Sequence, residues 1–209
     1  AFYLAALYYY IKGVKAGKPN QYMLRIILLF ILSGLSKIQA VTLPLSMLAI
    51  DYFLGRRIQM KRIFEKWFYF LISIIIGLIG IYFLRQHGSL ESSVSYAFYD
   101  RIFVGSFSYI VYFVKFLAPF QLLPLYPYPP QLNIVHYASI VPALAVVAFT
   151  FWAYLKEWKA LVFGIVFFTF NIFFLLQILG AGQGFQADRF TYIAYFGFGF
   201  ALTYYLQKL

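Results

Sequence analysis

A lysine inside a long apolar run most constrains how this chain can fold. The run extends from Tyr22 to Ile50 and carries only two charges, Arg25 near its start and Lys37 near its middle. A charge at the centre of a hydrocarbon layer costs roughly 2.5–3.5 kcal/mol on insertion scales unless it meets water or a partner. Basic clusters stand on both sides of Lys37, and basic loops stay on the cytoplasmic side of a membrane. The run therefore predicts a helical hairpin with residues 36–39 at its outer tip. The flanking cations are Lys12, Lys15, Lys18 and Arg25 on one side and Arg56, Arg57, Lys61, Arg62 and Lys66 on the other.

The two arms of this hairpin are expected at residues 22–35 and 39–54. Each arm is short, roughly 21–24 Å at 1.5 Å per residue, against a hydrocarbon core of about 30 Å. Short arms imply local thinning of the bilayer or a re-entrant hairpin packed in protein. Pro44 is expected to kink the second arm. The alternative is one long tilted helix from which Lys37 snorkels to the interface.

The composition places the chain among membrane proteins. Hydrophobic residues make up 64% of the sequence and aromatic residues 23%, and the mean hydropathy is +0.80. We therefore expect an all-α polytopic membrane protein with a single transmembrane domain over residues 1–209. The net charge of +11 comes from short basic loops, which fit topology signals and contacts with anionic headgroups, so nucleic acid is not an expected partner. The absence of cysteine excludes disulfides and thiolate chemistry.

The positions of the basic loops predict where the remaining spans cross the membrane and in which direction. The first apolar residues form only half a span and lack an initiator methionine, so we interpret the chain as a fragment truncated at both ends. Full crossings are expected at residues 67–84, 137–155, 161–179 and 190–206, with outer loops at 85–93 and 180–189. Gly77 and Gly80 are expected on a close-packing face of the first of these spans.

Residues 102–120 resemble a further span, but a polar stripe runs along them. The stripe consists of Arg101, Gly105, Ser108, Tyr112 and Lys115. Its spacings of three and four residues line one helical face, and apolar residues occupy the opposite face. We predict an amphipathic helix lying in the outer interface, which also keeps the loop at 156–159 on the inner side. The alternative is an ordinary span.

A proline-rich segment over residues 118–130 follows this helix. Its five prolines exclude a helix and favour an extended chain. Tyr126 and Tyr128 are candidates for stacking against a sugar or an acceptor peptide, and anchoring in the interface is the simpler interpretation.

The proposed topology collects most polar candidates on the outer face. Arg189 stands at the membrane boundary, where a guanidinium binds phosphate in bidentate fashion or contacts lipid headgroups. Asp188 has a structural interpretation as a helix cap. Lys37 is either a phosphate-binding charge or a structurally paired lysine. Asp51, near the inner end, is expected to pair with Arg56 or Arg57. The remaining outer candidates are Gln39, Arg85, His87, Glu91, Asp100, Arg101, Lys115 and His136, and no metal-ligand set is visible among them.

Three ordered stretches together resemble a known family. They are LSKIQAVTLP at 35–44 with DY at 51–52, LYPYP at 125–129, and ADRFTY at 187–192. In order and approximate spacing they resemble the membrane portion of bacterial relatives of the transmembrane-and-tetratricopeptide-repeat O-mannosyltransferases. These enzymes belong to the GT-C glycosyltransferase superfamily. The resemblance implies a GT-C-like helical bundle.

The resemblance also implies an activity. A sugar, mannose in the family, would pass with inversion from a polyprenyl-phosphate donor to a protein hydroxyl on the non-cytoplasmic face. The family's catalytic acid lies in the first outer loop, which would precede Ala1, so the fragment is not expected to act alone. No cofactor is implied, and the partners are the lipid-linked sugar, the acceptor protein and the bilayer. The membrane would be the bacterial inner membrane, or the endoplasmic reticulum in a eukaryote.

Carried over by position, the resemblance gives a set of donor-site candidates. Lys37 and Arg189 are the candidates for the donor phosphate, supported by Gln39, Asp188, Tyr192, Tyr126 and Tyr128. Two alternatives are a transporter or lipid-handling protein, in which the broken hairpin forms the substrate site, and a non-catalytic membrane subunit. An Asp in the missing upstream loop would favour the enzyme.

Overall fold

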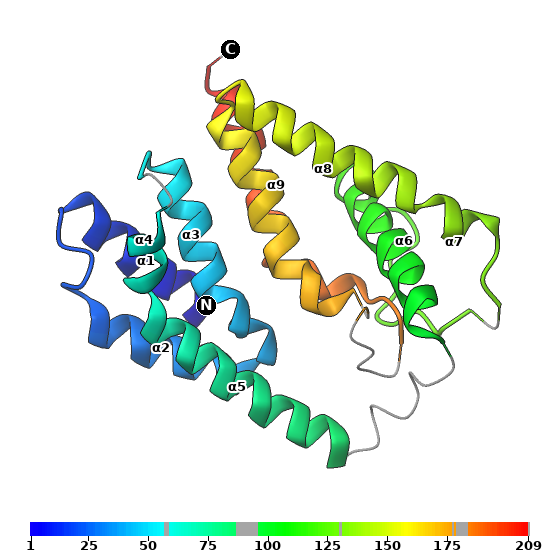
Figure 1. The fold of residues 1–209 in the computed structure, drawn as a ribbon, viewed down its shortest axis with the longest axis horizontal. Helices are drawn as coiled ribbons and strands as arrows, with labels where there is room; N and C mark the ends of the chain where they lie inside the picture. The colour runs from blue at the N-terminus through cyan, green and yellow to red at the C-terminus, as the bar shows by residue number, and fades with distance from the viewer. Residues whose placement is uncertain (57–58, 87–95, 130, 177, 179–183, 209) are drawn as a thin grey trace. The chain divides into compact units, whose positions relative to one another are not determined.

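The chain is helical, and its contacts divide it into two compact units. The computed structural model describes residues 1–56, 59–86, 96–129, 131–176, 178 and 184–208 (Figure 1). Within these ranges the β pairing is confined to one isolated antiparallel bridge between Tyr126 and Gln186. The N-terminal unit is Ala1–Tyr82 and the C-terminal unit is Phe83–Leu209. The predicted all-α class is confirmed. The expected loop at 85–93, with His87 and Glu91, lies largely outside the described residues, as do Arg57 and residues 180–183 of the last loop.

Helix α1 (Phe2–Lys15) organises the N-terminal unit. It packs against both α2 (Met23–Ser36) and α3 (Leu43–Phe53). Its buried positions recur every three or four residues, which places them on one helical face. They are Tyr3, Ala6, Leu7, Tyr10 and Gly13.

The chain breaks at Lys37, as the sequence predicts. Lys37 has an extended backbone, with φ −161° and ψ 127°, and so ends α2. A short 3₁₀ helix, η1 (Ile38–Thr42), follows and leads into α3. The two arms are therefore separate helices, and their crossing of a membrane stays a prediction.

Pro44 does not kink the second arm, so that prediction is wrong. The proline lies in the first turn of α3, where it fits without distortion. The first backbone N–H groups of a helix have no partner within the helix, so a proline there removes no hydrogen bond.

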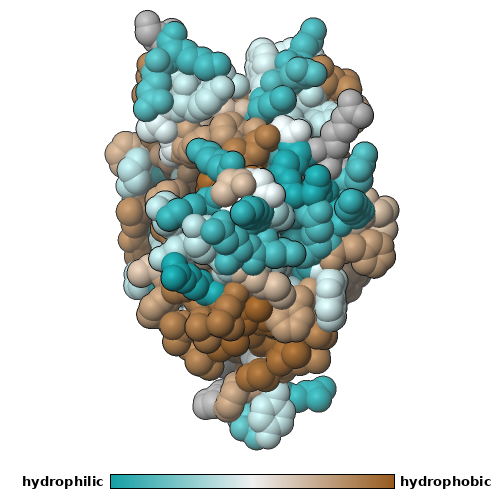
Figure 2. Space-filling model, turned by 90° about the vertical axis from the view of Figure 1, so that its left-hand side faces the viewer, coloured by the Kyte–Doolittle hydropathy of each residue, from teal (hydrophilic) through white to brown (hydrophobic). Residues whose placement is uncertain are grey.

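Among the described residues, two helical stretches are long and apolar enough to cross a membrane. One is α5 (Trp67–Gln86), which follows the short α4 (Met60–Phe64). The other is Ile134–Leu155, which consists of two successive helices joined at Ser139. Gly80 of α5 fits against Ile38, because a side chain there would clash with that isoleucine. Gly77 makes only an ordinary contact with Val41, so close packing is confirmed at Gly80 alone. Figure 2 shows one face of the molecule, on which hydrophobic atoms form a broad exposed surface.

The C-terminal unit is built around an aromatic core. Its helices are α6 (Phe98–Leu117), α7 (Ile134–Ala138), α8 (Ile140–Leu155), α9 (Lys159–Ile172) and α10 (Tyr195–Leu206), with 3₁₀ turns η3 (Phe173–Leu175) and η4 (Asp188–Phe190). Phe168 of α9 stacks on Phe198 of α10, with ring centroids 4.3 Å apart. Tyr109 and Tyr112 of α6 complete this core.

Helices α9 and α10 approach closely through small residues. A side chain added at Gly164 would meet the carbonyl oxygen of Gly197 and the side chain of Ala201. Small residues four apart allow helix backbones to pack tightly in membrane proteins. Both helices are shorter than the spans predicted at 161–179 and 190–206, because α9 gives way to η3 and α10 begins only at Tyr195.

The polar stripe of α6 faces the protein interior. Gly105, Ser108 and Tyr112 are buried, whereas Val114 and Leu117 on the opposite face are 54% and 73% exposed. A helix at a water interface would turn such a stripe outward. The burial therefore does not support the predicted interfacial orientation, and the side of the membrane reached after α6 stays a prediction.

Candidate functional site

A carboxylate cluster binds the last loop to α6. The two Asp188 carboxylate oxygens each lie 3.0 Å from the Nζ atom of Lys115. The Tyr126 hydroxyl and the Leu123 backbone N–H each donate to Oδ2 of Asp188 at 2.8 Å. Lys115 also contacts the Tyr126 hydroxyl. The Asp188 carboxylate is thus held by one cation and two neutral donors from the proline-rich segment and α6, and we call this group the Asp188 cluster.

The chain around Asp188 is fixed by backbone contacts as well. The Tyr112 hydroxyl accepts from the Ala187 N–H at 2.8 Å and lies 3.1 Å from the Ala187 carbonyl oxygen. The Tyr126 N–H donates to Gln186, and the Phe185 N–H donates to Tyr126. Gly184 makes this approach possible, because any side chain there would meet the Tyr126 carbonyl oxygen. The Tyr126 backbone therefore holds residues 185–186, and polar atoms of α6 hold residues 187–188.

Asp188 does not cap a helix, so its structural interpretation from the sequence is wrong in detail. Helix α10 begins seven residues later, at Tyr195, and η4 has no side-chain cap. The carboxylate is instead occupied by Lys115 and Tyr126. Sequence reasoning placed Lys115 in the polar stripe but not at the site, since its partner lies 73 residues away.

Arg189 follows this cluster and is exposed. Its guanidinium carbon lies 5.7 Å from the ring centroid of Phe190. Among the described residues no acidic side chain lies within salt-bridge distance of it. Because Lys115 neutralises Asp188, the two cations and one carboxylate leave one positive charge, which is carried by Arg189. An exposed guanidinium of this kind can bind a phosphate through two parallel hydrogen bonds.

The tyrosine candidates divide by exposure. Tyr128 is half-buried, with its ring centroid 5.8 Å from Tyr96 and 6.1 Å from Phe185. Burial raises the pKa of the Tyr128 phenol. Tyr126 is also half-buried, and its hydroxyl donates a hydrogen bond to Asp188. Only Tyr192 is exposed, at 55%. The rings of Tyr126 and Tyr128 therefore pack within the unit and do not form an open stacking surface.

Lys37 and Gln39 lie in the N-terminal unit, on either side of the start of η1. Lys37 is half-buried and Gln39 is 3% exposed. Nearby, the Tyr3 hydroxyl bonds with Thr42 at 3.0 Å and Ser46 at 2.7 Å, which ties the start of α3 to α1. The structure thus brings Asp188, Tyr126 and Arg189 together. It places Lys37 and Gln39 in the other unit.

A second carboxylate cluster lies at the opposite end of α3. Asp51 is fully buried and accepts from Tyr10 at 2.7 Å, Arg56 at 2.7 Å and Lys66 at 2.5 Å. The predicted pairing with Arg56 is confirmed, and Lys66 is an additional partner. Burial tends to lower the pKa of Arg56, but the hydrogen bond and charge of Asp51 raise it overall. Burial lowers the pKa of Lys66, and Asp51 opposes this only in part. We call this group the Asp51 cluster, and its saturated contacts make it a structural element.

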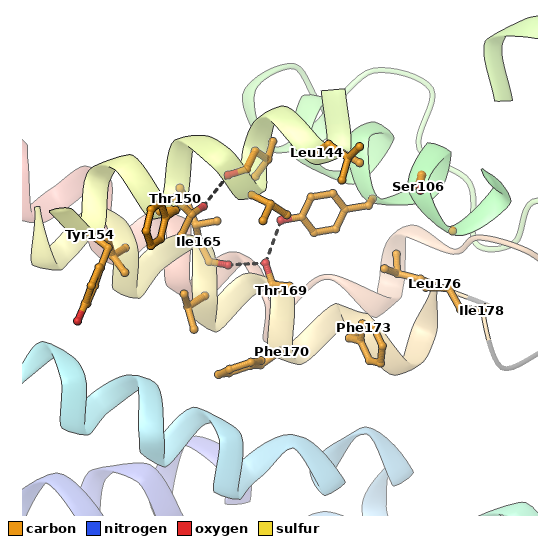
Figure 3. Close-up of a pocket in the computed structure, with 18 residues that line it drawn as sticks. Ser106, Leu144, Thr150, Tyr154, Ile165, Thr169, Phe170, Phe173, Leu176 and Ile178 are labelled. Atoms are coloured by element: carbon orange, nitrogen blue, oxygen red, sulfur yellow. Dashed lines mark hydrogen bonds between the residues drawn. The ribbon is translucent and has the colours of Figure 1, made fainter. Parts of the chain in front are cut away.

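A large apolar cavity opens between α6, α8 and α9 (Figure 3). Its volume is about 510 Å³, within the range of roughly 300–1,000 Å³ for ligand sites. Several of its hydroxyl groups bond within the protein: Tyr109 and Thr169 bond with each other at 2.9 Å, and Thr150 donates to the Val146 carbonyl oxygen. The cavity therefore suits a hydrocarbon chain, because these hydroxyl groups already have partners and do not require a polar ligand.

The described residues contain no group of three or more side chains suited to a metal ion. No protein-family model, curated protein or solved structure matches the chain. Functional interpretation therefore depends on the residues and contacts described above.

Proposed function

We propose that this chain is the membrane portion of a glycosyltransferase that uses a polyprenyl-phosphate-linked sugar. In this proposal Arg189 binds the donor phosphate, and the sugar, mannose by the family resemblance, passes to a protein hydroxyl on the non-cytoplasmic face. The observation that carries the proposal is the exposed Arg189 beside a carboxylate already neutralised by Lys115.

The exposure of the apolar helices supports a membrane location. Only 6% of the apolar window in α5 is buried, and only 11% of that in Ile134–Leu155. A core helix of a soluble protein would be mostly buried, and a signal sequence would lie near the N-terminus. Long apolar helices that are neither are expected to contact lipid.

Sugar transfer from a phosphate donor requires a fixed cation beside the phosphate, which is the leaving group. Breaking the bond between sugar and phosphate increases the negative charge on the phosphate, and a preplaced guanidinium stabilises that charge. The contacts of Tyr112 and Lys115 with residues 187–188 fix the backbone that carries Arg189. The acceptor hydroxyl needs a carboxylate base, which the family resemblance places in the first outer loop.

The apolar cavity offers a place for part of the donor lipid. It is lined by Gly105 and Tyr109 of α6, and later turns of the same helix hold Ala187 and Asp188. A phosphate at Arg189 and an apolar chain along α6 would share one scaffold. Lys37 lies in the other unit and stays a separate candidate for phosphate, predicted from its flanking basic clusters.

Binding of polyprenyl phosphate by the purified chain in detergent micelles tests the proposal without requiring turnover. Arg189→Ala should weaken binding about tenfold or more, because a charge-assisted hydrogen bond contributes roughly 1.5–3 kcal/mol. Arg189→Lys should restore only part of the affinity, since a point charge replaces a planar fork.

Lys208→Ala is the matched control, because it removes an exposed cation that also lies over an aromatic ring. Unchanged binding in the Lys37→Ala, Arg189→Ala double variant would remove these residues from the site. Binding that depends on Lys37 but not on Arg189 would favour the lipid-handling or transport alternative.

A further inference from the structure

A cluster of cations around Tyr22 stands at the end of α1 and the start of α2. The Lys12 Nζ atom lies 5.5 Å from the Tyr22 ring centroid, and the Arg25 guanidinium carbon lies 5.8 Å from it. Arg25 also lies 5.6 Å from the ring of Tyr9, which itself contacts Tyr22. Two cations from different helices are thus held against the same ring, an arrangement that orients their charges.

The turn between the helices fixes this arrangement. The Lys18 N–H donates to Gly13 and the Gln21 N–H donates to Lys18, both at 3.0 Å. Gly17 has φ +70°, a conformation that glycine adopts without strain. The backbone therefore keeps the last turn of α1 beside the first turn of α2.

In the described part of the N-terminal unit, the cluster has no acidic counterpart. Lys12, Lys15, Lys18 and Arg25 are all exposed, and the first 50 residues contain no Asp or Glu. In the rest of the N-terminal unit, the described carboxylates of Asp51 and Glu65 are bound by Arg56, Arg62 and Lys66. Within the N-terminal unit these four positive charges therefore have no carboxylate partner. The face that includes this turn has a broad hydrophilic area across its middle, with hydrophobic atoms below it (Figure 2).

An exposed apolar stripe begins at the same place and runs along α2. Its members recur at helical spacing from Leu24, which is 70% exposed, to Leu35, which is 81% exposed. The others are Leu28, Ile31 and Leu32. A ligand that satisfies both features has an anionic head and a hydrocarbon chain. Inorganic phosphate or nucleic acid would use the cations and leave the stripe uncovered.

We propose that the α1–α2 turn is a binding site for an anionic phospholipid. The phosphate of the lipid contacts Lys12 and Arg25, and an acyl chain lies along the exposed stripe of α2. Tyr8, Tyr9 and Tyr22 stand at the headgroup level, where tyrosines are enriched in membrane proteins. Clusters of four or more cations beside an apolar helix attract anionic lipid in this way. This site rests on the membrane location proposed above and not on glycosyl transfer.

The test compares lipids on the purified chain in detergent micelles, with bound lipid counted by native mass spectrometry. Phosphatidylglycerol should bind about tenfold or more tightly than phosphatidylcholine of the same chains, and salt should weaken the preference. Lys12→Gln with Arg25→Gln should reduce phosphatidylglycerol affinity roughly 25-fold, since each cation near an anionic surface contributes about fivefold. Lys156→Gln with Lys208→Gln removes the same charge from exposed positions in the other unit and should change affinity less than about twofold.

Several results would overturn the proposal. Equal losses in the two double variants would mean that only net charge matters. Equal binding of phosphatidylglycerol and phosphatidylcholine by the unaltered chain would show that the chain does not recognise the anionic headgroup. Inorganic phosphate that displaces phosphatidylglycerol at equal concentration would mean that the stripe contributes nothing.

The membrane location itself is checked separately by flotation of the chain with phosphatidylcholine vesicles. Loss of phosphatidylglycerol binding in the Lys12→Gln, Arg25→Gln variant and loss of polyprenyl-phosphate binding in Arg189→Ala are measured separately, which distinguishes failure of this site from failure of the proposed enzyme function.

Discussion

Asp51 and Asp188 are two carboxylates held by similar groups in very different surroundings. Each accepts a hydrogen bond from a tyrosine hydroxyl and pairs with a lysine. The side chain of Asp51 is fully buried and has two cationic partners, whereas that of Asp188 is 15% exposed and has one. The first carboxylate stabilises the N-terminal unit. The second positions a loop and leaves the next residue, Arg189, exposed.

The difference shows what the surroundings of an ion pair determine. A fully buried carboxylate must be saturated, because an unpaired charge in a low-dielectric interior is costly. A partly exposed carboxylate tolerates fewer partners because water supplies the rest. The Asp51 cluster therefore has no remaining capacity for a ligand. The Asp188 cluster lies at the surface, beside a cation whose charge is not cancelled.

The largest expected difference between the clusters comes from neutralising each carboxylate. Asp51→Asn should lower the free energy of unfolding by about 3–5 kcal/mol, because it leaves the buried Lys66 without its carboxylate partner. Asp188→Asn should cost on the order of 1–2 kcal/mol, since that pair is partly hydrated. Unfolding of the chain in mixed micelles, followed by circular dichroism, measures both values.

Glu157→Gln serves as the control for these two variants, because Glu157 is exposed. It should change the free energy of unfolding by less than about 0.5 kcal/mol. A cost for Asp188→Asn equal to that of Asp51→Asn would show that the two clusters do not differ in kind.

A smaller difference is expected when each tyrosine hydroxyl is removed. Tyr10→Phe should cost about 1.5–3 kcal/mol, because it removes a hydrogen bond to a buried charge and water cannot replace it. Tyr126→Phe should cost about 1 kcal/mol or less, because Lys115, Leu123 and water still reach Asp188. Chemical denaturation of the two variants side by side gives the comparison. The opposite order of effects would mean that Asp188 depends on Tyr126 more than its exposure suggests.

The smallest effect is a dependence of stability on pH in the N-terminal unit. Burial lowers the pKa of Lys66, so the unfolded chain binds the lysine proton more tightly than the folded chain. Stability should therefore rise with pH as the pH passes from the lowered pKa of Lys66 towards the ordinary lysine value of about 10.4.

Lys66→Arg isolates this effect, because arginine stays charged throughout. Between about pH 7.5 and 9.5, below the ordinary tyrosine pKa, the stability of the native chain should rise relative to that of the variant. Parallel dependences of stability on pH for the two proteins would show that folding does not lower the pKa of Lys66.

Some parts of the structure follow directly from local sequence. The break at Lys37 was predictable because a charge in an apolar run and the pattern of flanking cations both mark it. The pairing of Asp51 with Arg56 was predictable because the partners are five residues apart and few acids are present. The start of the helix at Ile134 follows from Asn133, whose side chain accepts from the N–H groups of Val135 and His136.

The candidate site was predictable only in part. Arg189 and Asp188 could be singled out as charges at the end of an apolar stretch. Lys115 could not be assigned to them, because only folding brings α6 beside residues 187–188. Pro44 was misplaced because a proline has opposite effects in the first turn and in the interior of a helix, and the start of α3 depends on the turn η1.

The sequence by itself determined that this chain is helical, where the apolar run breaks between α2 and α3, and which charges stand apart from apolar surroundings. These features depend on hydropathy and on interactions between near neighbours. Only the tertiary structure decided that the polar stripe of α6 faces inward and that Asp188 pairs with Lys115 and accepts a hydrogen bond from Tyr126. It also decided that Lys12 and Arg25 both lie over the ring of Tyr22. Contacts of this kind join residues distant in sequence, and their energies depend on burial, which no local pattern specifies.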